Sequence, residues 1–259
     1  MTITPEFLLS PAELDVLWHD LELGRMPYPL DVPSLGSTME ERTQLRRDVL
    51  DGLARRDLAT DRRLQDLLRL LGDHEIAVDA VANMERRPVR AVAASDGNQA
   101  VLAIIDEDRI GLVEVRPTSL AKSIVGVLSD GSAGPGSALS LRLETLASAV
   151  AMHDEPDESD DPWGDEELDE KQALQRAGLS KQDASVISEL AENRVAGGQF
   201  GVTRRGKNRY RSERAEVLIN WFDTPQGRYL MVRENGWLSL SPTDNERIAN
   251  RIDSVLASV

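Results

Sequence analysis

The chain has 259 residues, a formal net charge of −15 and no cysteine. This charge argues against general affinity for nucleic acid or for an anionic membrane surface, because both attract basic proteins. The missing thiols exclude cysteine catalysis, cysteine-ligated metals and disulfide bonds, and they fit a reducing compartment. The sequence shows no signal peptide and no apolar run of about 18 residues, so we expect a cytoplasmic protein.

Three helices are predicted ahead of the first strands. Ser10-Pro11 supplies an N-cap and a proline for the first turn of a helix over residues 10–23. Apolar residues at helical spacing predict a second helix, from Ser37 or Thr38 to about residue 56, and a third over residues 61–71. These helices would form an N-terminal bundle.

Short strands follow the bundle. Asp96-Gly97-Asn98 and Asp106-Glu107-Asp108 are typical of hairpin turns, because Asp, Asn and Gly tolerate positive φ. Short turns join antiparallel neighbours, so these strands belong to an antiparallel sheet. The expected elements are a strand starting at 76–78, a loop at 83–88, strands at 89–94, 100–105 and 110–115, and a helix from Pro117-Thr118.

The later part of the chain begins with a glycine-rich segment, residues 131–137, which we interpret as a flexible joint. Residues 154–170 are strongly acidic and are expected to form a mobile, solvated segment, with an acidic docking tail as the alternative. The expected ordered elements are helices at 139–150, 167–177 and 180–194, strands at 198–203, 215–222, 228–233 and 237–241, and a final helix after Pro242.

The two halves of the chain, residues 1–130 and 138–259, follow one plan. In each, three strands joined by turns lead through Pro-Thr (Pro117-Thr118 and Pro242-Thr243) into a helix. The plan is common enough for two copies to coincide. We nevertheless expect a single α+β domain over residues 1–259, with a quasi-two-fold central antiparallel sheet flanked by N-terminal and C-terminal helical bundles, because neither half has enough strands to be stable alone.

No catalytic or cofactor constellation is visible. His19, His74 and His153 lack metal-ligand spacing, and no serine sits in a Gly-x-Ser-x-Gly elbow. The glycine-rich segment lacks the lysine of a phosphate loop, and the acidic segment lacks the ligand spacing of a calcium loop. We therefore assign no catalytic residue, metal or cofactor, and expect a protein that works by binding another protein.

The one dense basic patch is Arg204-Arg205-Gly206-Lys207-Asn208-Arg209-Tyr210-Arg211. It falls where a hairpin is expected to turn. A solvated hairpin tip, paired with the acidic segment, is the first interpretation. Protein contact is the second, and contact with a nucleic-acid backbone is the third.

The second half resembles the EspG family, the secretion-associated proteins of the actinobacterial type VII (ESX) system. The resemblance rests on Phe222-Asp223-Thr224-Pro225-Gln226-Gly227-Arg228 between two strands, on the Trp237 strand, and on Pro242 before a terminal helix. The helix at 10–23, an extended segment at 28–32 and two further helices also fit. The acidic segment is heavier, and the loop at 83–88 shorter, than the family leads us to expect.

The resemblance implies a chaperone, a monomer or a homodimer, that caps the apolar tip of a helical PPE-type substrate paired with its PE partner. It places partner contacts in two loops at equivalent positions of the repeat, with ordinary exposed turns as the alternative. The candidate contact residues are Asn83, Met84, Glu85, Arg86, Arg87, Arg204, Arg205, Lys207, Arg209 and Arg211. The rival functions are a small-ligand-binding or enzymatic α+β domain and a nucleic-acid binder through residues 204–211.

Overall fold

The computed structural model describes residues 3–84, 87–106, 108–154, 170–206 and 212–259. Within these residues the chain forms two compact units. One unit contains Met1–Asp130, Gly198–Ala215 and Asn245–Val259, and the other contains Gly131–Gly197 and Glu216–Asp244. The unit boundaries therefore differ from the boundaries of the two sequence halves. The halves as a repeat remain a prediction.

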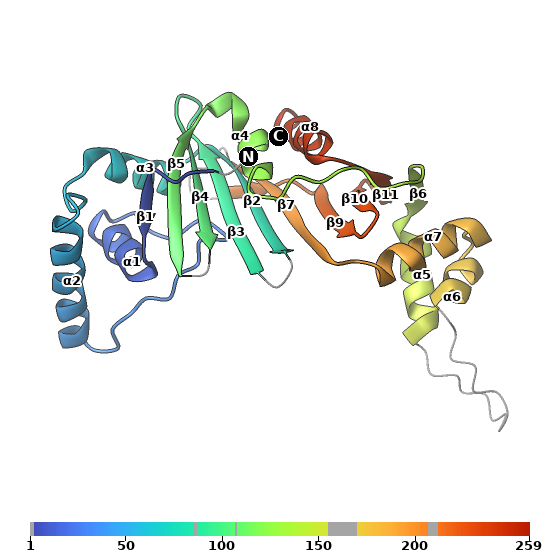
Figure 1. Ribbon diagram of the computed structural model, residues 1–259, viewed down its shortest axis with the longest axis horizontal. Coiled ribbons are helices and arrows are strands. Elements are labelled where there is room, and N and C mark those ends of the chain that lie inside the picture. The colour runs from blue at the N-terminus through green and yellow to red at the C-terminus, as the bar shows by residue number, and fades with distance from the viewer. Residues whose placement is uncertain (1–2, 85–86, 107, 155–169, 207–211) are drawn as a thin grey trace, which may run out of the picture. The chain divides into compact units, whose positions relative to one another are not determined.

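The first unit is built on an antiparallel sheet, with strands in the order β1-β5-β4-β3-β2-β7 and with β8 paired to β7 (Figure 1). The strands are β1 (Phe7–Leu9), β2 (Ile76–Met84), β3 (Arg87–Ser95), β4 (Ala100–Asp106), β5 (Arg109–Val115), β7 (Ala196–Arg205) and β8 (Ser212–Arg214). The predicted loop at 83–88 was too long, because β2 continues through Met84 and β3 begins at Arg87.

Helices cover both faces of this sheet. On one face, α1 (Pro11–Asp20), α2 (Met39–Ala54) and α3 (Arg62–Gly72) enclose the largest apolar cluster, which includes the buried Trp18, Leu53 and Leu68. The short helices η1 (Pro117–Ser119) and α4 (Leu120–Val125) follow β5, and α4 packs against β2, β3 and α8 (Asn245–Leu256).

The first three helices form because their starts are encoded locally. The side chains of Ser10 and Thr38 accept the backbone N–H groups of Glu13 and Glu41, whose carboxylates accept the cap N–H groups in return. Asp61 accepts the N–H of Leu64 at 2.8 Å. The predicted N-terminal helices are confirmed.

The second unit has its own antiparallel strands, in the order β9-β10-β11-β6. They are β6 (Leu139–Arg142), β9 (Leu218–Thr224), β10 (Gly227–Glu234) and β11 (Trp237–Pro242). The helices are α5 (Leu143–Asp154), α6 (Glu170–Arg176) and α7 (Lys181–Glu192). The helix expected over 139–150 was wrong at its start, because residues 139–142 pair with β11 as a strand. The acidic residues 155–169 lie outside the described part of the chain.

The glycine-rich segment 131–137 is held against β10 and does not form the flexible joint that composition suggested. The backbone of Arg228 donates to the Ser132 carbonyl at 2.8 Å and accepts from the Gly134 N–H at 3.2 Å, and the Tyr229 hydroxyl donates to the Pro135 carbonyl at 2.9 Å. A Cβ atom at Gly131 would lie 2.4 Å from Cζ of Arg228. Position 131 therefore requires glycine, because any side chain there would collide with the Arg228 guanidinium.

The expected α+β class, with antiparallel strands and helices in both parts of the sequence, is confirmed. In each part a short strand that precedes the helices pairs with the last strand of the meander: β1 pairs with β5, and β6 pairs with β11. No helix in the described ranges is both long enough and apolar enough to cross a membrane.

Candidate functional site

The first predicted contact loop is the turn between β2 and β3. Asn83 and Met84 end β2, and Met84 pairs with Arg87 at the start of β3. Asn83 is exposed and Met84 is half-buried. Glu85 and Arg86 lie outside the described residues, as does the side chain of Arg87.

The second predicted contact loop follows β7, and its first two arginines make internal contacts. Arg205 forms an ion pair with Asp73 at 2.6 Å, and its backbone N–H donates to the Glu75 carbonyl at 2.7 Å. The Arg204 guanidinium donates to the carbonyl oxygen of Val259. Lys207, Arg209 and Arg211 lie outside the described residues. Within the first unit, Arg204 and Arg205 thus tie the end of β7 to Val259, Asp73 and Glu75.

The structure does not bring the two predicted loops together. Arg205 lies beside Glu75, at the start of β2. A Cβ atom at Gly198 would meet Val81 and Ala82, near the end of β2, so β2 and β7 run antiparallel. The described residues that lead into the two loops, Met84 and Arg205, therefore lie at opposite ends of β2, about 30 Å apart at roughly 3.3 Å per residue.

An uncovered stretch of sheet lies next to the β2–β3 turn. Ala77, Asp79, Val81 and Asn83 alternate onto one face of β2. The first two are buried, Val81 is half-buried and Asn83 is exposed. Their partners on β3 follow the same gradient, from buried Val92 through half-buried Arg90 to exposed Pro88. We call Val81, Asn83, Pro88 and Arg90 the open face.

A buried charge borders the open face. Asp79 is 3% exposed, and both of its carboxylate oxygens accept from Arg214, at 2.6 and 3.0 Å. Burial raises the pKa of Asp79, and the hydrogen bonds from Arg214 oppose that rise. The same pairing raises the pKa of Arg214.

Arg214 reaches Asp79 by crossing β7 at a glycine. A Cβ atom at Gly201 would lie 1.9 Å from a terminal nitrogen of Arg214, so only glycine leaves room for the guanidinium. The Tyr28 ring lies on the same guanidinium, 5.9 Å from Cζ, and Tyr28 itself is 55% exposed. Residues from three distant parts of the sequence thus meet beside the open face.

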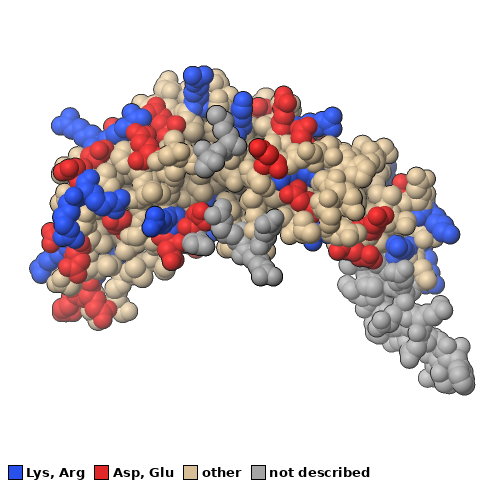
Figure 2. Space-filling model, in the orientation of Figure 1, with Lys and Arg blue, Asp and Glu red and all other residues tan. Residues whose placement is uncertain are grey.

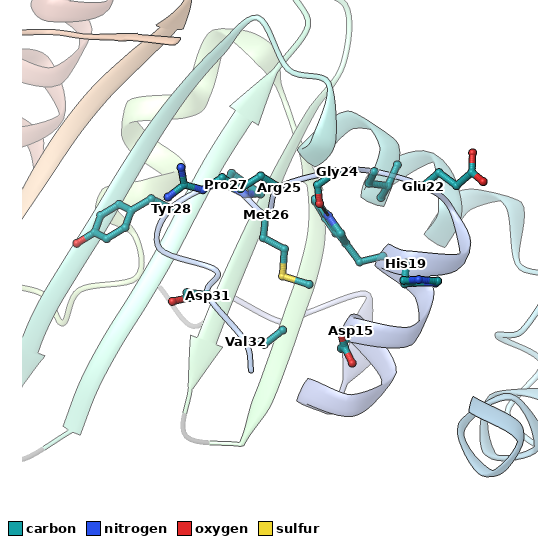
Figure 3. A pocket seen from close by; sticks show the side chains of 12 residues that line it. Asp15, His19, Glu22, Gly24, Arg25, Met26, Pro27, Tyr28, Asp31 and Val32 are labelled. Carbon is teal, nitrogen blue, oxygen red and sulfur yellow. Dashed lines mark hydrogen bonds between the residues drawn. The ribbon is translucent and has the colours of Figure 1, made fainter. Parts of the chain in front are cut away.

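A cleft of about 690 Å³ lies between α1 and the extended segment that follows it (Figure 3). The indole of Trp18 donates to the Gly24 carbonyl at 2.9 Å and thereby fixes the turn that joins the two walls. Met26 and Val32 pack against the apolar cluster of the unit, so the floor of the cleft is continuous with that cluster. Arg90 of the open face donates to the Asp31 carbonyl at 3.5 Å, at the margin of the same cleft.

The sequence interpretation missed Tyr28, Asp79, Gly201 and Arg214. One clue was present, since Asp79 interrupts the apolar run Ile76-Ala77-Val78-Asp79-Ala80-Val81, and a buried carboxylate needs a partner. Nothing in the sequence indicates that its partner lies 135 residues away.

Charged side chains do not gather into a basic stripe on the surface in view. On the face shown in Figure 2, Lys and Arg side chains are interleaved with Asp and Glu. Among the described residues, no three His, Asp or Glu side chains are placed to hold a metal ion.

The model of the EspG family matches residues 10–254 of the sequence. The chain belongs to the EspG family. The structure is similar to that of the Mycobacterium tuberculosis type VII secretion system chaperone EspG5, solved in complex with a PE25-PPE41 dimer. The TM-score is 0.70 at 14% sequence identity, over 96% of this chain and 95% of that chain. No curated protein sequence matches the chain.

The residues that carry the family resemblance are structural in this EspG-family chain. Asp223 accepts from Arg228 at 2.7 and 2.8 Å, and the guanidinium lies over the Trp221 ring, 4.6 Å from its centroid. Thr224 accepts the N–H of Gln226 at 3.2 Å inside the turn. The side chains of Asp223, Thr224 and Arg228 therefore build the β9–β10 hairpin from within.

Proposed function

We propose that this EspG-family chain is a cytoplasmic, non-enzymatic chaperone that binds the apolar helical tip of a PE/PPE-type substrate and keeps it soluble for type VII secretion. The family match over residues 10–254 carries the proposal, and the likeness to EspG5 in complex with PE25-PPE41 supports it. An exposed apolar tip on a helical substrate would self-associate, and burying it against a chaperone removes that hazard.

The open face and the adjoining β2–β3 turn are proposed as the main contact. Val81 and Arg90 are half-buried and Asn83 is exposed, so a partner can bury additional area there without unfolding this chain. A stable complex needs roughly 1,200–2,000 Å² of total buried surface, more than one turn provides. The proposed contacts are Asn83, Met84, Glu85, Arg86 and Arg87, together with the open face.

Arg204, Arg205, Lys207, Arg209 and Arg211 are proposed as a separate and weaker contact. The internal partners of Arg204 and Arg205 leave those two side chains less able to bind a substrate. The distance of about 30 Å along β2 means that one narrow tip would not reach both turns.

Co-expression tests the proposal. This chain and a PE/PPE pair encoded near its gene should co-purify on a tag and co-elute in gel filtration, while the pair alone should aggregate. Asn83→Arg should reduce co-purification strongly. Asn98→Arg, the same change in the exposed β3–β4 turn, is the matched control and should leave it unchanged. Failure with every PE/PPE pair encoded nearby would overturn the proposed function.

The nucleic-acid alternative is disfavoured by the net charge of −15 and by the internal ion pair of Arg205. Oligonucleotide binding measured at low salt tests it, since phosphate contacts are strongest there.

A further inference from the structure

The cleft beside α1 has a fixed shape that no proposed substrate contact uses. Its walls are joined by a tight turn in which Glu22 and Gly24 both have positive φ, at 53° and 70°. The N–H of Leu23 donates to the Trp18 carbonyl at 3.2 Å inside that turn. At about 690 Å³ the cleft lies within the roughly 300–1,000 Å³ range of small-molecule and cofactor sites.

The floor of the cleft is apolar and adaptable. Met26 reaches into the space between the two walls (Figure 3), beside Val32. A methionine at such a position can adjust its shape to a range of apolar side chains, because its thioether chain is unbranched and polarisable.

The ends of the cleft carry negative charge. Glu22 and Asp31, both exposed, lie on opposite sides of Met26 in Figure 3. A third carboxylate, that of Asp15, is already paired with Arg42. Arg25 supplies the single guanidinium among the described residues that line the cleft, so within the lining the carboxylates of Glu22 and Asp31 outnumber the guanidinium groups. Arg90 lies outside the lining, at the margin, where it donates to the backbone carbonyl of Asp31.

We propose that this cleft is a second docking site, which binds a protein segment carrying one apolar side chain flanked by Lys or Arg. The apolar side chain would lie on Met26 and Val32, and the flanking cations would pair with Glu22 and Asp31. The lining of this site is distinct from the proposed chaperone contact, because no residue of the open face or of the β2–β3 turn lines the cleft. The two surfaces adjoin, since Arg90 of the open face donates to the Asp31 carbonyl at the cleft margin.

Binding of defined peptides tests the site. The probes are 5-carboxyfluorescein-Gly-Lys-Leu-Lys-Gly-amide, labelled at its N-terminus, and its counterpart with Glu in place of both Lys, titrated against the full chain by fluorescence anisotropy. We expect the Lys peptide to bind and the Glu peptide not to bind. Because exposed ion pairs contribute little, Asp31→Asn and Glu22→Gln should each weaken binding by about two- to fivefold. Met26→Ser should weaken it further.

Glu192→Gln is the matched control, because it removes one exposed carboxylate of α7 and therefore the same overall charge. It should leave the affinity unchanged. Circular dichroism of each variant separates a lost site from a lost fold. Equal affinity for the two peptides, equal weakening by Glu192→Gln and Asp31→Asn, or no binding of the Lys peptide at low salt would each overturn the proposal.

Discussion

Two arginine–aspartate pairs, Asp79–Arg214 in the first unit and Asp223–Arg228 in the second, bury opposite partners. In the first unit the Asp79 side chain is 4% exposed and Arg214 is 40% exposed. In the second unit the Arg228 side chain is fully buried and Asp223 is 23% exposed. A carboxylate can take up a proton and lose its charge, whereas a guanidinium stays charged at every accessible pH. The second pair should therefore tolerate the loss of its partner less well.

The largest expected effect comes from Asp223→Ala, which removes the carboxylate that accepts two hydrogen bonds from the buried Arg228 guanidinium. We expect the free energy of unfolding of the second unit to fall by about 3–5 kcal/mol, as when other buried pairs lose one member. Urea denaturation followed by tryptophan fluorescence would measure it. Glu192→Ala, an exposed carboxylate of the same unit, is the control, and equal losses in the two variants would contradict the comparison.

Gly131 lies against Arg228 and Gly201 lies against Arg214. Substituting each glycine tests whether the buried arginine tolerates crowding less well than the exposed one. A Cβ atom at Gly131 would lie 2.4 Å from Cζ of the fully buried Arg228, which cannot move aside. We expect Gly131→Ala to lower the free energy of unfolding by about 1–3 kcal/mol. Gly201→Ala should have a smaller effect, because Arg214 can swing toward solvent. A larger loss in Gly201→Ala, measured by thermal denaturation, would reverse this order.

Arg214→Met tests whether the Asp79 carboxylate takes up a proton, and so loses its charge, when its partner is removed. Without Arg214, burial is opposed only by a backbone hydrogen bond, and the folded pKa of Asp79 lies further above the ordinary value of 3.8. The resulting loss of stability should be about 1–2 kcal/mol at pH 7, and it should shrink as the pH is lowered toward 4, because the folded carboxyl is protonated first. Urea denaturation of both proteins between pH 4 and pH 8 measures this, and a loss that is constant with pH would refute it.

The smallest expected effect on stability comes from His74, which lies just before β2. Burial and the nearby Arg205 lower the pKa of His74 below 6.5. The unfolded chain then takes up the proton first, so stability should decline as the pH falls below about 6.5. His74→Gln should remove this part of the pH dependence between pH 7 and pH 5, and an unchanged slope in its thermal denaturation would show that His74 does not contribute.

The sequence predicts those parts of the fold whose causes are local. The helix starts at Ser10, Thr38 and Asp61 were predictable because the capping side chain and the N–H that it accepts are three residues apart. The three shortest strands were not predicted. Three or four residues carry little periodicity, and β1, β6 and β8 take their strand conformation from pairing with β5, β11 and β7.

The candidate site was predicted in part, for the same reason. The position of the β2–β3 turn could be inferred from the alternation of short strands. The pairing of Arg205 with Asp73 could not, because clustered arginines look solvent-exposed when their partner is more than 100 residues away. Glycines 131 and 134 looked like a flexible joint because the side chains that need the space, Arg228 and Tyr229, are also distant in sequence.

The placement of the Asp223–Arg228 motif inside the β9–β10 hairpin has a consequence for how such chains diverge. A mutation in the motif would be selected against through folding, whichever protein is bound, whereas exposed positions such as Asn83 can change without disturbing the hairpin. Two chains that share the motif can therefore inherit the same scaffold and still differ in the partners that they accept.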